Sequence, residues 1–134
     1  MQFRIESASR VPIYRQLGEQ IREAIATGRL ACDEKLPSVR EMSRMLVLNP
    51  NTVARVYMEL EREGVVDTRP GLGVFVARPR NELTKRVRRE RLTRSLDALL
   101  TEAVHLGFLA EEVRSLVEDR IRRFHWERGE AERP

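Results

Sequence analysis

The stretch that most constrains the fold is residues 46–64, "LVLNPNTVARVYMELEREG", where a proline stands between two asparagines before apolar residues at helical spacing. Asn49 is suited to cap a helix that begins with Pro50, a position at which the missing N–H of proline costs nothing. Another helix lies just upstream, because Ser38 and Glu41 have the S-x-x-E spacing of a capping box. Two short helices joined by so tight a turn predict a helix-turn-helix.

Further elements surround this pair. The segment "PIYRQLGEQIREAIATG" predicts a first helix that ends at Gly28 and carries one apolar stripe. After Gly64, two β-branched stretches, Val65 to Thr68 and Val74 to Val76, flank a turn that contains glycines and a proline, which predicts a β-hairpin. In the third helix, the positions predicted to face the core are Val53, Val56, Tyr57 and Leu60. The positions left outside are Asn51, Thr52, Arg55, Glu59 and Arg62.

From Glu82 onward the chain is predicted to be all-helical, with apolar residues every three to four positions and a stop at Gly107. Two amphipathic helices joined by about four residues form an antiparallel αα-hairpin. Such a hairpin buries only one side of itself and needs a partner surface. We expect dimerisation through Leu92, Leu96, Leu99, Val113, Leu116 and Ile121. The predicted fold class is α+β, with an N-terminal domain over 1–77 and a helical dimerisation tail over 78–134.

Positive charge is concentrated in one place. The chain has a net charge of +4, whereas residues 78–94 alone carry eight basic and two acidic side chains. This basic run has two interpretations, a solvated helix face or a segment that lies along a DNA backbone, and the sequence leaves both open.

A helix-turn-helix followed by a β-hairpin is the winged helix order, in which one helix enters the major groove and the hairpin reaches the neighbouring backbone. Asn51 and Thr52 are short hydrogen-bonding side chains on the first turn of the third helix, and Arg55 follows one turn later. We therefore predict that these three contact DNA. The alternative is that the polar residues around Asn49 only cap the helix, and for Asn49 itself this alternative is favoured.

The quoted motifs "LPSVREMSRML", "NPNTVARVYMELEREGVV" and "TRPGLGVFV" resemble the N-terminal winged helix of the GntR family of bacterial repressors, and the short helical tail resembles its YtrA-type branch. The resemblance implies that Arg40 binds phosphates or bases and that the wing contributes Gly71 with Arg69 beside it. It also implies DNA contacts from the start of the recognition helix, at Asn49, Asn51, Thr52 and Arg55.

Three positions depart from the family pattern, and one of them, Val74, lacks the hydroxyl of the threonine that is usual in the wing. Val47 stands where the family has a glycine in the turn between the helices, so a positive φ there would strain the valine. Leu109 stands where the last helix usually has a serine or threonine cap, so that helix end is expected to fray.

The predicted function is that of a homodimeric, sequence-specific transcription regulator, with repression at a palindromic double-stranded DNA operator as the expected mode. The alternative is a winged helix protein-interaction module without DNA specificity. Two separated histidines, one cysteine and scattered carboxylates form no convergent set, so we expect no enzyme, no metal site and no cofactor. No signal peptide or membrane span is expected, which predicts a cytoplasmic protein. The short tail leaves little room for a pocket, so a small-molecule effector stays an open question.

Overall fold

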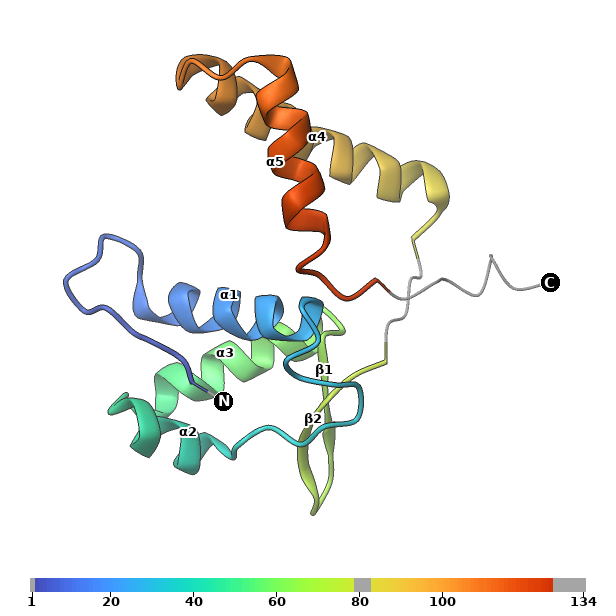
Figure 1. Ribbon diagram of the computed structural model, residues 1–134. Coiled ribbons are helices and arrows are strands. Elements are labelled where there is room, and N and C mark those ends of the chain that lie inside the picture. The colour runs from blue at the N-terminus through green and yellow to red at the C-terminus, as the bar shows by residue number, and fades with distance from the viewer. Residues whose placement is uncertain (1, 79–82, 127–134) are drawn as a thin grey trace. The chain divides into compact units, whose positions relative to one another are not determined.

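A computed structural model describes residues 2–78 and 83–126. The chain divides into two compact units. One contains Met1–Pro79 together with the segment from His125 onward, and the other contains Arg80–Phe124. Each is described by itself. The elements follow in the order α1 (Ile13–Ala26), α2 (Val39–Leu46), α3 (Pro50–Arg62), β1 (Val66–Arg69), β2 (Gly73–Val76), α4 (Lys85–His105) and α5 (Ala110–Ile121) (Figure 1).

The core of the N-terminal unit lies between α1, α3 and the hairpin. The stripe predicted on the first helix supplies Leu17, Ile21 and Ala24, all buried. The four residues predicted to face inward from α3 are buried too, which confirms that prediction. They join one apolar cluster with Leu30, Leu36, Met42, Val66 and Val76. The outer side of α3 therefore does not contribute to the core.

Both predicted helix starts are confirmed. The Ser38 hydroxyl accepts a hydrogen bond from the Glu41 amide at 3.1 Å, and the Glu41 carboxylate accepts one from the Ser38 amide at 3.1 Å. The hydrogen bond from the Ser38 amide is the main reason that the pKa of Glu41 lies below its ordinary value. At α3 the Asn49 side-chain oxygen accepts a hydrogen bond from the Asn51 amide at 2.8 Å, and Pro50 is the first helical residue. Local side-chain caps thus set where both helices of the helix-turn-helix begin.

The turn between α2 and α3 requires a left-handed residue. Val47 occupies that position with φ 53° and ψ 53°. Its side chain is 90% exposed, so packing does not compensate for the unfavourable conformation of a β-branched residue. The expected strain at Val47 is therefore present.

The two strands form an antiparallel hairpin with Val66 opposite Val76 and Arg69 opposite Gly73. The first strand begins and ends one residue later than predicted, and the second begins one residue earlier. The difference arises because cross-strand pairing extends the ladder to Arg69 and Gly73, which β-branched composition alone does not indicate. Gly73 has φ 124°, a conformation that glycine tolerates.

The C-terminal unit is an αα-hairpin, as predicted, with Leu106–Leu109 as its turn. The Thr84 hydroxyl caps α4 by accepting a hydrogen bond from the Val87 amide at 3.2 Å. Leu109 cannot cap α5 with its side chain, but its amide donates to the Glu112 carboxylate at 2.9 Å. This contact replaces part of the missing serine or threonine cap. Among the described residues, no helix is long and apolar enough to cross a membrane.

Candidate nucleic-acid interface

The residues predicted to contact DNA come from α2, α3 and the wing, which is the β1–β2 hairpin. Arg40 on the first turn of α2 is exposed, as are Asn49 and Asn51 at the start of α3, whereas Thr52 is half-buried. Gly71 is exposed at the tip of the wing and has φ 75°. In Figure 1, α1 lies along one side of α3, while α2 and the wing tip extend towards the other side. Most of the predicted set is therefore accessible on the N-terminal unit.

Arg40 and Asn49 differ in whether the side chain already has an interaction within the described part of the protein. Within residues 2–78 and 83–126, the Arg40 side chain makes no ion pair, so its charge is available to a phosphate. The Asn49 side-chain oxygen is already used as the cap of α3. Capping is thus an observed role for Asn49, and DNA contact stays a prediction.

Arg55 leaves α3 on the side of α1. Its guanidinium carbon lies 3.9 Å from the centre of the Tyr14 ring, and its Nε lies 3.4 Å from a Glu59 carboxylate oxygen. These contacts hold the side chain in one place although it is more than half exposed. A base contact by Arg55 requires it to leave Tyr14, a condition that the sequence did not indicate.

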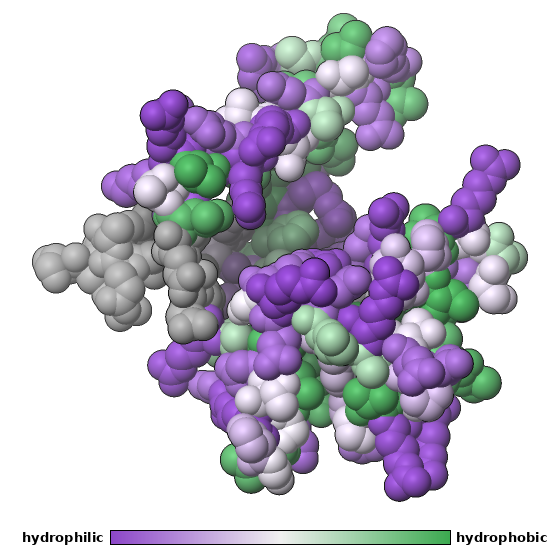
Figure 2. All heavy atoms as spheres, turned by 180° about the vertical axis from the view of Figure 1, so that it is seen from behind, coloured by the Kyte–Doolittle hydropathy of each residue, from purple (hydrophilic) through white to green (hydrophobic). Residues whose placement is uncertain are grey.

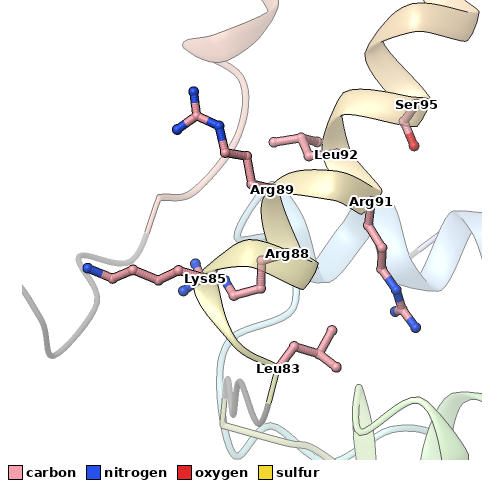
Figure 3. Close-up of a pocket in the computed structure, with 7 residues that line it drawn as sticks. All are labelled: Leu83, Lys85, Arg88, Arg89, Arg91, Leu92 and Ser95. Atoms are coloured by element: carbon pink, nitrogen blue, oxygen red, sulfur yellow. The ribbon is translucent and has the colours of Figure 1, made fainter.

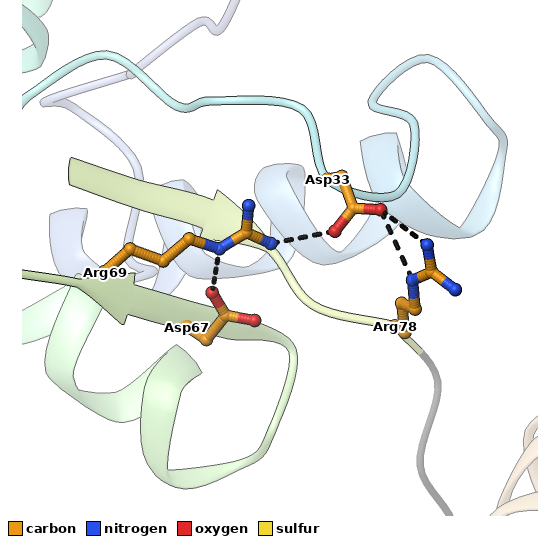
Figure 4. A network of polar contacts seen from close by, with 4 residues as sticks. All are labelled: Asp33, Asp67, Arg69 and Arg78. Carbon is orange, nitrogen blue, oxygen red and sulfur yellow. Dashed lines mark hydrogen bonds and ion pairs between the residues drawn. The ribbon is translucent and has the colours of Figure 1, made fainter. Parts of the chain in front are cut away.

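Arg69 is held by two carboxylates rather than pointing freely from the wing (Figure 4). It donates to Asp33 at 2.8 Å and to Asp67 at 3.1 Å, and its guanidinium stacks on the Phe75 ring at 4.2 Å. Arg78 donates to the other Asp33 oxygen through two nitrogens at 3.2 Å and 3.3 Å. The hydrogen bond from Arg69 is the main reason that the pKa of Asp33 lies below its ordinary value. Arg69 therefore joins the wing to the segment before α2, and its predicted DNA contact would be additional.

Lys35 was missed by the sequence analysis. It forms an isolated antiparallel bridge with Phe75, and the neighbouring Leu36 amide donates to the Val74 carbonyl at 2.8 Å. The Lys35 side chain lies across Gly73, because a Cβ atom on that glycine would stand 2.8 Å from the Lys35 Cε. The structure thus adds an exposed cation to the wing. No local motif could have indicated this, since the two residues are far apart in the chain.

Tyr57 connects α3 to the segment that leads into α2. Its hydroxyl donates to the Pro37 carbonyl at 2.6 Å, and burial raises the pKa of this phenol. The residue was predicted only as a core position. Its hydrogen bond fixes the start of α2 relative to the third helix.

The helical tail has no core of its own, because no residue of α4 or α5 is buried. Apolar residues instead lie exposed among charged ones, which is visible over the C-terminal helices in Figure 2. Of the residues predicted to dimerise, Val113 is half-buried and the other five are exposed. An apolar groove of about 620 Å³ runs between the helices. Of the six residues, Leu96 and Val113 line it, whereas Leu92, Leu99, Leu116 and Ile121 do not.

Comparison with known proteins places these features in a family. The family model described as "Bacterial regulatory proteins, gntR family" matches residues 13–76, from the start of α1 to the end of β2. The HTH-type transcriptional repressor YtrA of Bacillus subtilis is 31% identical over 86% of this chain and 88% of its own length. The chain belongs to the GntR family. The uncharacterized HTH-type transcriptional regulator YhcF of the same organism is 40% identical over 76% of this chain and 84% of its own length.

The three-dimensional comparison extends over both units of this GntR-family protein. A crystal structure described as a transcriptional antiterminator from Listeria monocytogenes EGD-e has a TM-score of 0.77 and 31% identity, and it covers 97% of this chain and 98% of the other. The resemblance to the YtrA-type branch and the winged helix fold are thereby confirmed. The protein is a DNA-binding transcriptional regulator of the GntR family.

Proposed function

We propose that this GntR-family regulator acts as a homodimeric repressor that reads a palindromic double-stranded DNA operator. The observation that carries the proposal is the pairing of an accessible winged helix with a helical hairpin that buries no residue of its own. Two winged helices held by a symmetric dimer would each contact one half-site, so the operator would repeat the symmetry of the protein. The repressor YtrA, with a similar sequence over nearly its full length, supports repression as the mode.

The proposed DNA contacts divide by chemistry. Asn51, Thr52 and Arg55 would meet base edges, because amide, hydroxyl and guanidinium groups match the hydrogen-bonding pattern of the major groove. Arg40 and Lys35 would meet phosphates, since both are exposed cations outside the first turn of α3. The other proposed contacts are Asn49, Arg69 and Gly71.

The proposed dimer interface is the apolar surface of the tail, including Leu92, Leu96, Leu99, Val113, Leu116 and Ile121. Four helices, two from each subunit, would then bury the side chains that one hairpin leaves in water. The groove of about 620 Å³ has the size of a ligand pocket. Because a second hairpin would fill it with apolar side chains, we assign the groove to the dimer and propose no effector.

The DNA part of the proposal is tested by selecting duplexes from a random pool with the full chain and then comparing variants on a recovered duplex and on an unrelated one. Asn51→Ala should lose about 1 to 3 kcal/mol on the selected duplex and little on the unrelated one, as expected for a base contact. Glu61→Ala, an exposed residue near the end of α3, serves as the control. If no duplex is enriched and binding shows no salt dependence, the rival proposal of a protein-interaction module is favoured.

The dimer part is tested by sedimentation of Leu99→Glu, which puts a charge on the proposed interface. Thr101→Glu adds the same charge to the opposite side of α4 and is the matched control. Leu99→Glu should sediment as a monomer and should bind the full operator roughly 10² to 10⁴ times more weakly, because the second half-site contact is no longer intramolecular. If Leu99→Glu stays dimeric and binds the operator normally, the dimer contact lies on another surface.

A further inference from the structure

The two helices of the tail differ in length, and the groove between them involves only part of α4. With 21 residues against 12, α4 is about 31 Å long and α5 about 18 Å. The groove between them uses α4 only from Leu96 onward. The first half of α4 borders a separate open concavity of about 710 Å³, lined by seven residues from Leu83 to Ser95 and by none from α5 (Figure 3). Residues 85–94 therefore lie outside the groove, and we call this N-terminal part of α4 the overhang.

The overhang is strongly basic. It carries six basic side chains and one acidic side chain, Glu90, in ten residues. Arg86 pairs with Glu90 at 3.1 Å. Within the part of the chain that the structure describes, the other five cations make no ion pair. They are Lys85, Arg88, Arg89, Arg91 and Arg94. Figure 3 shows Lys85 and Arg89 projecting to one side of the helix and Arg91 to the other.

The face of α4 that lines the groove changes from apolar to basic towards the N-terminus of the helix. Leu96, Leu100 and Ala103 line the groove with α5. Continued towards the N-terminus at helical spacing, this face presents Leu92, then Arg89, then Lys85. An apolar dimer interface that extended over this region would bury unpaired cations, which is costly. The cationic part of the overhang therefore fits a partner other than the apolar surface of a second tail, whereas Leu92 lies at the edge of the proposed dimer interface.

From these observations we infer that the overhang is a second DNA-binding surface, which contacts the phosphate backbone beside the segment read by the winged helix. The inference rests on the proposed operator binding. Duplex DNA carries one negative charge about every 1.7 Å of helix axis, so an overhang about 15 Å long meets several phosphates. Arginine guanidinium groups suit such contacts because they donate paired hydrogen bonds to phosphate oxygens.

The chain connection sets an upper limit on the distance between the end of the wing and the start of the overhang. Arg78 forms an ion pair with Asp33 at the base of the hairpin. Five residue steps lead from Arg78 to Leu83, and they span at most about 18 Å when fully extended. The overhang begins directly after Leu83 and Thr84. This linker length is compatible with the wing and the overhang binding the same duplex. Of the two interpretations of the basic run, the DNA backbone is therefore the one that we adopt.

The alternative partner is the acidic surface of α5 from a second subunit. That helix carries four acidic residues, but Glu111 pairs with Arg114, and Asp119 lies 3.7 Å from Arg122. Its carboxylates are therefore partly neutralised already. Five unpaired cations match a polyanion better than this helix.

The test compares the full-length protein with the variant R88Q/R89Q/R91Q, since glutamine keeps the helix propensity and removes the charge. R120Q/R122Q/R123Q, three arginines at the end of α5 and just beyond it, is the matched control. Each protein is titrated with salt on a selected operator with flanks of about 10 base pairs and on one trimmed to its core. The slope of log K against log salt falls by about 0.9 for each phosphate that the protein no longer neutralises, so removing one such phosphate per subunit lowers the slope of a dimer by roughly two units.

We expect the overhang variant to show this lower slope and at least tenfold weaker affinity on the flanked duplex, with little change on the trimmed one. Its preference for operator over random sequence should be unchanged, because phosphate contacts carry no sequence information. R88K/R89K/R91K should restore the slope. If the wild-type protein binds no duplex, the proposed function itself fails. If the wild type binds specifically and the overhang variant has the same slope, the second surface is refuted. If the variant dissociates into monomers and its slope per subunit is unchanged, the second DNA-binding surface is also refuted. The overhang would then contact the acidic surface of α5 in the second subunit.

Discussion

The Arg55 guanidinium is stacked on the Tyr14 ring, with 3.9 Å between the guanidinium carbon and the ring centre. A residue predicted to contact bases is thus held against α1 in the protein without DNA. The contact keeps the side chain ordered, and an exposed stack of this kind is worth only about 0.5 to 1 kcal/mol. DNA binding could therefore break it at a small cost.

The first prediction concerns this pair. Arg55→Ala should cost about 1 to 3 kcal/mol on a selected operator and little on random duplex, if the side chain moves to a base. Tyr14→Leu removes the stack without removing the charge, so it should leave specific binding equal or slightly tighter. Fluorescence anisotropy on both duplexes measures these changes. If Arg55→Ala loses the same binding free energy on both duplexes, Arg55 contacts a phosphate. If Arg55→Ala and Tyr14→Leu lose the same binding free energy, the Arg55–Tyr14 contact has a structural role.

A second prediction concerns the left-handed turn at Val47. Val47→Gly should raise the free energy of unfolding by roughly 0.5 to 1.5 kcal/mol, because a side-chain-bearing residue in this conformation costs about 1 to 2 kcal/mol and glycine recovers most of it. The side chain is almost fully exposed, so little packing is removed. Urea unfolding measures the change. The control is Val39→Gly, at the first position of α2, which should destabilise the protein. Lower stability in Val47→Gly would show that this turn carries no strain.

The Tyr57 hydroxyl gives a third prediction. Tyr57→Phe should lower the free energy of unfolding by about 0.5 to 1.5 kcal/mol, because the hydrogen bond to the Pro37 carbonyl is removed from a largely buried site. Tyr14→Phe is the matched control, since the Tyr14 hydroxyl makes no hydrogen bond within the described residues. Thermal unfolding of both variants should separate them. Equal melting temperatures would mean that the hydrogen bond contributes nothing net.

A fourth prediction concerns pH and the base of the wing. The hydrogen bond from Arg69 lowers the pKa of Asp33, so folding favours the ionised carboxylate. The resulting stabilisation is complete above the ordinary aspartate pKa of about 3.9 and is lost as the pH falls through the lower folded value. We expect the Arg69 and Arg78 contacts to open only below about pH 4, as followed by NMR of the Asp33 carboxyl and the arginine Nε–H groups.

Asp33→Asn is the variant that tests this assignment. Asparagine tolerates the left-handed backbone at this position, φ 67°, but cannot ionise. The acid transition of the wing should be absent in this variant, with the contacts already weakened at neutral pH. An Asp33 carboxyl that titrates at its ordinary pKa in the folded protein would contradict the prediction.

The sequence by itself determined the local elements. Ser38 with Glu41, and Asn49 with Pro50, fixed the starts of α2 and α3, because a cap joins a side chain to a backbone amide two or three residues away. The buried face of α3 followed from helical spacing alone. The motifs of the winged helix also carried enough information to indicate the family, which the comparisons confirmed.

Only the tertiary structure decided how charged side chains are used. The resemblance implied a DNA contact by Arg69 in the wing, but Asp33, from the segment before α2, accepts one of its hydrogen bonds. Lys35 reaches the wing because its segment pairs with β2, and no spacing in the sequence indicates that bridge. The sequence left two interpretations of the basic run open, and the groove with α5, which uses α4 only from Leu96 onward, favoured the DNA interpretation. Long arginine and lysine side chains have many rotamers of similar energy, so neighbours brought close by folding select among them, whereas caps and turns are selected by the backbone beside them.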